Sequence, residues 1–469
     1  MPNVPRFIPP RSVYDRLCGI LALIMLICVC GGQIGGQHWP QLVALNWVAA
    51  ICAVTLAVLR LPNVRPIAKV FVGLAIAAAA GVLLFAPQNA NQLDRALQQG
   101  TAFSTFLTTL GLVRGPVRAS RLVATAAAYL FSFPAKFRTA AVTYGSQFLT
   151  ILFNLGTISM MADIAKNHAE GRDSGADPKA ITLAALRGTL LATAWNPIGI
   201  GYAVVLAAIS GADPALLLAI TFGSTLLLTA LGLRVAKIQD DSIATPAEAA
   251  PVAGGGWAVI GLLAAVAGLI AATLALHWVL HISFLVAACI VLPAMSLIWP
   301  LVEPSARAGA PLNPVAAMGD ASASTASEAT VFLSAALISV PAALLLHSIG
   351  LENLFESPAV PQLVFILGCM LLIPLLAAVY VPHTISFVII TQVVGASSVG
   401  AAHPLSLGLA LMFAWAMAIS ISPISAMSLI AGNSIGRSAF DVSLKINRTF
   451  TLVTLCGATI LVSLLYLLE

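Results

Sequence analysis

Two groups of polar residues interrupt long apolar stretches of the chain, and both combine residue types that could bind an ion. The first group consists of Asn154, Gly156, Thr157 and Ser159, followed further along by Trp195, Asn196 and Gly199. The second consists of His383, Thr384 and Ser386, followed by Ser420, Ser422 and Ser425. Hydroxyl, amide and carbonyl oxygens are the ligands that a hard cation such as sodium prefers. We therefore predict candidate sodium sites at Asn154, Thr157 and Asn196 and at Thr384, Ser386 and Ser422.

The two groups also carry a short internal repeat. Thr157-Ile158-Ser159 recurs as Thr384-Ile385-Ser386, an offset of 384 − 157 = 227, and Pro197-Ile198 recurs as Pro423-Ile424, an offset of 423 − 197 = 226. Such short matches arise by chance among apolar helices, but these two share almost the same offset. Each proline lacks an amide donor and should break its helix. Freed carbonyls at such a break can coordinate a cation, and the N-terminal ends of half-helices attract an anion.

The composition places these groups in a membrane protein. Of the 469 residues, 60% are hydrophobic and 8% are charged, whereas soluble domains carry roughly 25% charged residues. This excludes a cytosolic enzyme, a secreted disulfide scaffold and a nucleic-acid binder. The seven cysteines lie in apolar segments without metal-ligand spacing, so we expect no cofactor beyond sodium as a coupling ion.

Apolar stretches of spanning length predict eleven transmembrane helices. They are Leu17–Gly36, Gln41–Leu61, Ile67–Pro87, Gly100–Leu112, Ile181–Ser210, Ala215–Leu233, Trp257–Leu276, Ile282–Pro300, Thr330–His347, Pro404–Ile430 and Thr449–Leu468. Two more apolar stretches, Thr139–Ala162 and Pro361–Val394, do not fit as simple spans. The Ala- and Ser-rich stretch Ala306–Ser327 is predicted to be a linker.

The basic residues decide how the two extra stretches run. If both are re-entrant hairpins and the N-terminus is cytoplasmic, 21 of the 22 basic residues lie inside and only Arg95 lies outside. If Thr139–Ala162 crossed the membrane, Lys166, Lys179 and Arg234 would be among those facing outward. The charge pattern therefore predicts a multi-pass protein of the inner (cytoplasmic) membrane, with its C-terminus outside.

The repeat and the charges together predict an all-α polytopic membrane protein with about eleven transmembrane helices plus two opposed re-entrant hairpins in two inverted repeats. Residues 1–37 form a tail and an extra first span. Residues 38–237 form the first repeat, with an inside hairpin at about 134–166 and a broken helix at 181–210. A cytoplasmic linker covers 238–256. Residues 257–469 form the second repeat, with an outside hairpin at about 361–397 and a broken helix at 404–430.

This architecture resembles the ion transporter superfamily, particularly the divalent anion–sodium symporters, from the second span to the last. Where that family has Ser-Asn-Thr in its hairpins, this chain has Asn154-Leu155-Gly156-Thr157 and Pro382-His383-Thr384. The resemblance implies ion and substrate sites at the hairpin tips and at the broken helices. It also implies a homodimer that works as an elevator, with Gly115–Ala135 and Ile349–Val360 as interfacial arms.

From these patterns we expect a secondary active transporter of a small, anionic solute, coupled to sodium or protons, and not an enzyme. Its partners would be the solute, the lipid bilayer and a second copy of the chain, with no nucleic acid. His383 could carry a proton, donate to the solute or be a packed polar residue, and Arg187 could anchor at the interface or reach the solute. The alternatives are a membrane-embedded glycan or acyl transferase or polymerase, and the membrane subunit of a binding-protein-dependent transport system.

Overall fold

The computed structural model describes residues 13–154, 156–170, 177–239, 252–309, 313–350 and 361–469, and within these ranges every regular element is helical. The first ten helices are α1 (Val13–Gly35), α2 (Leu45–Arg60), α3 (Pro66–Phe85), α4 (Ala90–Ala119), α5 (Arg121–Phe131), α6 (Ala135–Phe153), α7 (Gly156–Glu170), α8 (Pro178–Ala192), α9 (Ile200–Ala208) and α10 (Pro214–Gln239). The others are α11 (Gly255–Leu280), α12 (Phe284–Val302), α13 (Pro314–Ser324), α14 (Ala326–Ser348), α16 (Gln362–Ala378), α17 (His383–Gly395), α18 (Ser398–Ala402), α19 (Pro404–Ile421), α20 (Ala426–Ile435) and α21 (Arg448–Leu468).

The chain is a polytopic membrane protein. Among the described residues, nine helical segments are long and apolar enough to cross a bilayer. They correspond to nine of the eleven predicted spans. The fourth prediction, Gly100–Leu112, was too short, because α4 runs over 30 residues from Ala90 to Ala119. The fifth, Ile181–Ser210, is divided into the shorter helices α8 and α9.

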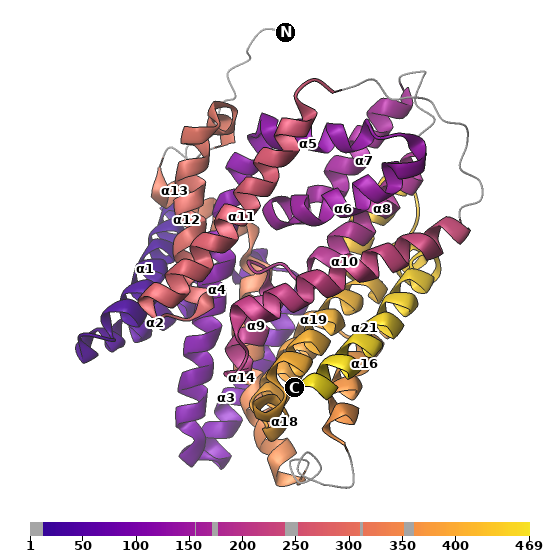
Figure 1. The fold of residues 1–469 in the computed structure, drawn as a ribbon. Helices are drawn as coiled ribbons and strands as arrows, with labels where there is room; N and C mark the ends of the chain where they lie inside the picture. The colour runs from indigo at the N-terminus through magenta and orange to yellow at the C-terminus, as the bar shows by residue number, and fades with distance from the viewer. Residues whose placement is uncertain (1–12, 155, 171–176, 240–251, 310–312, 351–360) are drawn as a thin grey trace.

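The helices form two groups (Figure 1). In one group α1 packs against α2 and α13, and α4 packs against α12 and α14. In the other, α6 and α7 pack against α8, while α16 and α21 pack against α19. The segment Pro404–Ile435, which contains α19 and α20, is the innermost part of the molecule. In this segment 89% of the most apolar window is buried, against at most 44% in the other spans. The serines predicted at the second break, Ser420, Ser422 and Ser425, therefore lie on the best-enclosed segment.

The prediction that Ala306–Ser327 is a linker is wrong. Most of this stretch is helical, because α13 occupies Pro314–Ser324 and packs against α1. Small residues allow that contact: a Cβ added at Gly19 would come within 2.0 Å of the Val315 carbonyl oxygen. Alanine, glycine and serine suit close packing of membrane helices as well as they suit a linker, so composition misled the prediction. The predicted linker 238–256 falls mostly outside the described residues, as does most of the arm Ile349–Val360.

The other predicted arm contains α5, and Glu303 fixes where this helix begins. The Glu303 carboxylate, just after α12, accepts hydrogen bonds from the Ser120 hydroxyl, the Ser305 hydroxyl and the Leu122 N–H, the last at 3.0 Å. Burial raises the pKa of Glu303, but these hydrogen bonds and one from the Arg121 N–H outweigh it, so the pKa lies below its ordinary 4.5. The anion thus stabilises the N-terminus of α5.

Glu303 should make stability depend on pH. Its folded-state pKa is lowered, so its contribution is complete above pH 4.5 and is lost as the pH falls through the lower folded value. We expect Glu303→Gln to melt at a lower temperature than the native chain between pH 6 and 8, and the difference to shrink below about pH 4. Melting curves across this range, with the exposed Asp163→Asn as control, check this. A difference that grows on acidification would contradict it.

Candidate functional site

The first hairpin turns sharply at Asn154. This residue ends α6 with φ 51°, a left-handed value that is uncommon outside glycine, and α7 starts at Gly156. The helix that follows is interrupted as Pro197 predicts, since α8 ends at Ala192 and α9 begins at Ile200. Asn196 shapes the break, because its side-chain oxygen accepts a hydrogen bond from the Ile198 N–H at 3.1 Å.

The second half has the same two features. Its hairpin turns at Tyr380, where φ is 67°, and α17 begins at His383 directly after Pro382. The following helix stops at Ile421 and resumes at Ala426, with Pro423 inside the gap. Each half therefore presents two helix N-termini next to irregular backbone, and such ends can bind an anion or leave carbonyls for a cation.

Several predicted site residues already have partners within the chain. The Trp195 indole donates to Gln147, Ser159 donates to the Gly156 carbonyl and Ser386 donates to the His383 carbonyl. Ser425 is the N-cap of α20, because its hydroxyl accepts from the Ser428 N–H at 3.1 Å. These side chains shape the turns and breaks, as does Asn196.

Three predicted side chains have a buried polar atom without a hydrogen-bond partner among the described residues. They are the hydroxyls of Thr157 and Ser422 and the Nδ1 atom of His383. Thr157 and Ser422 are both completely buried. Buried polar groups in proteins normally have partners, so these atoms are the best candidates for contacting a ligand. Asn154, Gly156, Thr384 and Gly199 lie beside them at the hairpin tips and the first break, and all four are half-buried.

The fold brings the two halves together crosswise. Helix α7 of the first hairpin contacts α20 from the second break, and α9 from the first break contacts α17 and α19. Gly201 on α9 lies against Trp415, where a Cβ would meet the indole at 2.6 Å. Trp415 also packs against His383, with ring centroids 5.3 Å apart and the rings tilted by 54°. His383 therefore lies next to the first half.

Sequence reasoning missed the residues that support the first break. Gln147 accepts from the Trp195 indole at 3.1 Å and donates to the Thr229 hydroxyl at 2.8 Å, all three being buried. The rings of Phe148 and Phe222 pack edge-on against Trp195. A glutamine in the middle of an apolar hairpin was the signal that could have revealed Gln147, since a buried amide needs partners.

Arg187 on α8 contacts residues of the second half. Its Nε donates to the Asn447 side-chain oxygen at 3.2 Å, and its guanidinium lies over the Phe450 ring at 5.5 Å. Asn447 in turn donates to the Ser420 hydroxyl at 2.7 Å. Ser420 is also bonded to the Thr451 hydroxyl at 2.7 Å. This chain of hydrogen bonds fixes the end of α19 to α8 and α21.

Removing Asn447 should therefore loosen the second break. Asn447→Ala leaves the half-buried Arg187 Nε and the buried Ser420 hydroxyl without this partner, which we expect to cost about 2 kcal/mol. The melting temperature in detergent should fall by several degrees. The matched control is Asn433→Ala at an exposed position on α20, which should melt like the native chain. Equal melting of both variants would show that the network contributes nothing.

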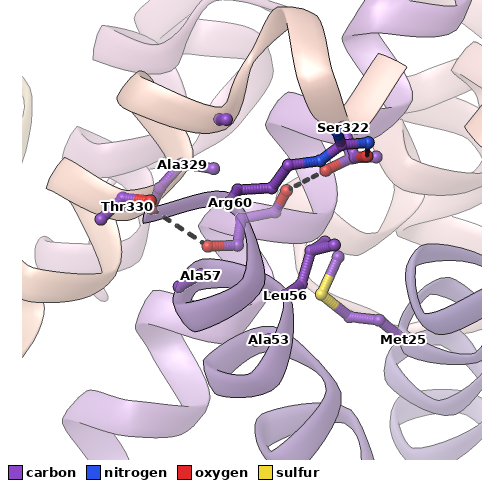
Figure 2. Close-up of a pocket in the computed structure, with 11 residues that line it drawn as sticks. Met25, Ala53, Leu56, Ala57, Arg60, Ser322, Ala329 and Thr330 are labelled. Carbon is purple, nitrogen blue, oxygen red and sulfur yellow. Dashed lines mark hydrogen bonds between the residues drawn. The ribbon is translucent and has the colours of Figure 1, made fainter. Parts of the chain in front are cut away.

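A separate polar cluster surrounds Arg60 at the end of α2 (Figure 2). Arg60 is 4% exposed, and its guanidinium forms an ion pair with Asp15 at 3.3 Å and donates to the Gly319 carbonyl at 2.9 Å and to Ser322 at 3.1 Å. The adjoining cavity measures about 20 Å³, close to what one water molecule needs and too small for a solute. This cluster therefore joins α1, α2 and α13 and is not a solute site.

No family model and no curated protein matches this chain. Two of the solved structures that share its fold are transporters. One is the YdaH transporter of Alcanivorax borkumensis, described as having an unusual topology, with a TM-score of 0.57, 15% identity, and coverage of 85% of this chain and 97% of that one. The other is MtrF of Neisseria gonorrhoeae, described within a class of antimetabolite efflux pumps, with a TM-score of 0.57, 15% identity, and coverage of 84% and 93%. The likeness establishes a fold found in transporters, and the narrower resemblance to divalent anion–sodium symporters remains a prediction.

Proposed function

We propose that this chain is a secondary active transporter of a small organic anion, coupled to sodium or protons. The observation that carries the proposal is the pair of buried hydroxyls, Thr157 and Ser422, that lack partners within the described residues. Thr157 lies at the first hairpin tip on α7 and Ser422 lies in the second break, just before α20, and α7 contacts α20. Sodium would be bound by hydroxyl, amide and carbonyl oxygens at the hairpin tips and breaks. The N-terminal ends of α7, α9, α17 and α20 supply positive potential for the anion.

The fold shared with YdaH and MtrF supports a transporter over the alternatives. A transferase or polymerase would need catalytic groups on sizeable loops outside the membrane, and the outer loops predicted from the charge pattern hold few titratable residues. Because MtrF is described with efflux pumps, the proposal includes export of the solute as well as uptake.

For the mechanism we propose alternating access by an elevator motion of a homodimer built from two inverted repeats. The moving part would contain the hairpins and broken helices α6–α9 and α16–α20. The scaffold would contain the group around α1, α2, α12 and α13. Irregular backbone is tolerated at membrane depth where it is buried in protein or lines a cavity. We place both breaks in the moving part because the candidate ligand contacts lie at them.

Ligand-dependent stability tests this proposal. The melting temperature of the purified chain is measured with acetate, benzoate and succinate, each with sodium chloride or choline chloride at pH 6 and pH 8. A ligand that binds only the folded chain stabilises it by mass action. We expect one acid to raise the melting temperature more when sodium is present, or more at the lower pH. If no acid shifts the melting temperature under any condition, coupled binding of such anions is contradicted.

A further inference from the structure

A cavity of about 450 Å³ lies between the two groups of helices, away from the hairpin tips. It is lined by residues of α1, α2, α4, α9 and α12. In Figure 1, α9 occupies the centre of the molecule, with α4 on one side and α19 on the other. A cavity of this size can hold a drug-sized molecule.

One basic residue and several amides line this cavity. Arg95, Gln33, Asn46 and Gln99 all contribute, and none of their side chains is hydrogen-bonded to the part of the chain that the structure describes. Arg95 is also the one basic residue of 22 that the charge pattern leaves outside. The neighbouring Asp94 does not line the cavity and accepts a hydrogen bond from Gln98 at 2.9 Å. The cavity therefore carries a positive charge and unused amide donors.

The remaining wall is apolar and belongs partly to the first broken helix. Ala203, Leu206 and Ala207 line the cavity at positions i, i+3 and i+4, which is one face of α9, and Ser210 lines it from the turn that follows the helix. Gly201, elsewhere on α9, lies against Trp415, which packs against His383. A single helix thus separates the cavity from the second-half site. Phe284, Leu285 and Val286 of α12 add to the apolar surface.

We propose that this cavity is an outer vestibule that binds an organic monoanion. Arg95 pairs with the carboxylate, Asn46 and Gln99 donate hydrogen bonds to it, and the apolar body of the solute lies against Leu206 and Phe284. One cation among the lining residues suits a single carboxylate better than two. The inference rests on the proposed function, because the vestibule would receive or release the transported solute next to α9.

Charge-selective labelling tests the vestibule without requiring transport. Ser210→Cys places a thiol on the cavity wall, and the purified chain in phosphatidylcholine nanodiscs is treated with an anionic or a cationic methanethiosulfonate reagent. Labelling is counted by intact mass as the increment over the native chain, which has seven cysteines of its own. We expect Arg95→Gln to lower the anionic-to-cationic rate ratio about threefold or more at Ser210→Cys. The ratio should not change at the exposed control His38→Cys, which does not line the cavity.

Protection by a ligand completes the test. Benzoate should slow labelling of Ser210→Cys at least about twofold, whereas benzamide, its neutral analogue, should not, and Arg95→Gln should abolish the protection. The vestibule is contradicted if Arg95→Gln changes neither ratio nor protection, or if phosphatidylglycerol nanodiscs protect and benzoate does not, which would indicate a lipid headgroup site. Ion-coupled flux with no effect of Arg95→Gln on labelling would overturn the vestibule alone. Benzoate protection without any flux would support the vestibule and overturn the proposed transport.

Discussion

Replacing Arg60 with methionine should lower the apparent melting temperature of the protein in detergent by about 5 °C, corresponding to roughly 3 kcal/mol. Arg60 is almost completely buried, and its guanidinium bonds to Asp15, to the Gly319 carbonyl and to Ser322. Methionine has a similar length but no donor, so Asp15 loses a charged partner at the contact between α1 and α13. Removing one member of a buried ion pair costs more stability than replacing both members by apolar residues, because it leaves the other charge without its partner.

The control is Arg65→Met, which removes a basic residue at an exposed position five residues further on. It should melt within about 1 °C of the native chain. Arg60→Lys should fall between the two, because an ammonium keeps the charge but not the planar donor geometry of the guanidinium. The explanation is wrong if Arg60→Met and Arg65→Met melt at the same temperature.

Alanine at Thr157 or Ser422 should reduce ion or solute affinity about 10-fold or more without lowering stability. Each hydroxyl is fully buried and has no partner among the described residues, so alanine removes an unsatisfied group and the fold loses no hydrogen bond. If the hydroxyl instead bonds a ligand, its loss leaves the ligand with one contact fewer, which is worth about 1–3 kcal/mol. Affinity and stability should therefore change independently.

Ser425→Ala provides the matched control for Ser422→Ala. The two serines are three residues apart in the same break, but Ser425 is the N-cap of α20. Its replacement should cost about 1 kcal/mol of stability. Melting temperatures and ligand-induced shifts measured side by side separate the roles. If Ser422→Ala lowers the melting temperature as Ser425→Ala does and leaves the ligand shift intact, Ser422 is a structural residue.

Features with a local cause could be predicted from the sequence. Pro197 and Pro423 each lack an amide donor, and the helices before them, α8 and α19, end at Ala192 and Ile421. Hydrophobic length located nine spans that the structure contains. Asn154 and His383 were placed at the hairpin turns because polar residues break apolar stretches, and α7 and α17 begin at or just after them.

Features that depend on tertiary packing could not be predicted from the sequence. Ser420 and Ser422 look alike in the sequence, yet the Ser420 hydroxyl bonds to Asn447 and Thr451 at the start of α21, while the Ser422 hydroxyl has no partner in the described chain. Arg60 is one of 22 basic residues in the sequence, and its contacts with Gly319 and Ser322 arise only because α13 packs near the end of α2. The alanine-rich α13 itself resembled a linker, because composition does not reveal whether small residues face solvent or another helix.

Ion-driven flux in proteoliposomes tests the central claim most directly. The purified chain is reconstituted, and movement of radiolabelled acetate, benzoate and succinate is followed in both directions under a sodium gradient, a proton gradient or neither. Protein-free liposomes report passive permeation of the neutral acids. We predict that one gradient drives at least one acid against its concentration gradient, and that the Thr157→Ala, Ser422→Ala double variant, folded and reconstituted to the same level, loses this flux. Flux unaffected by the double variant would contradict the site, and no flux above protein-free liposomes in either direction would contradict ion-coupled transport of these anions.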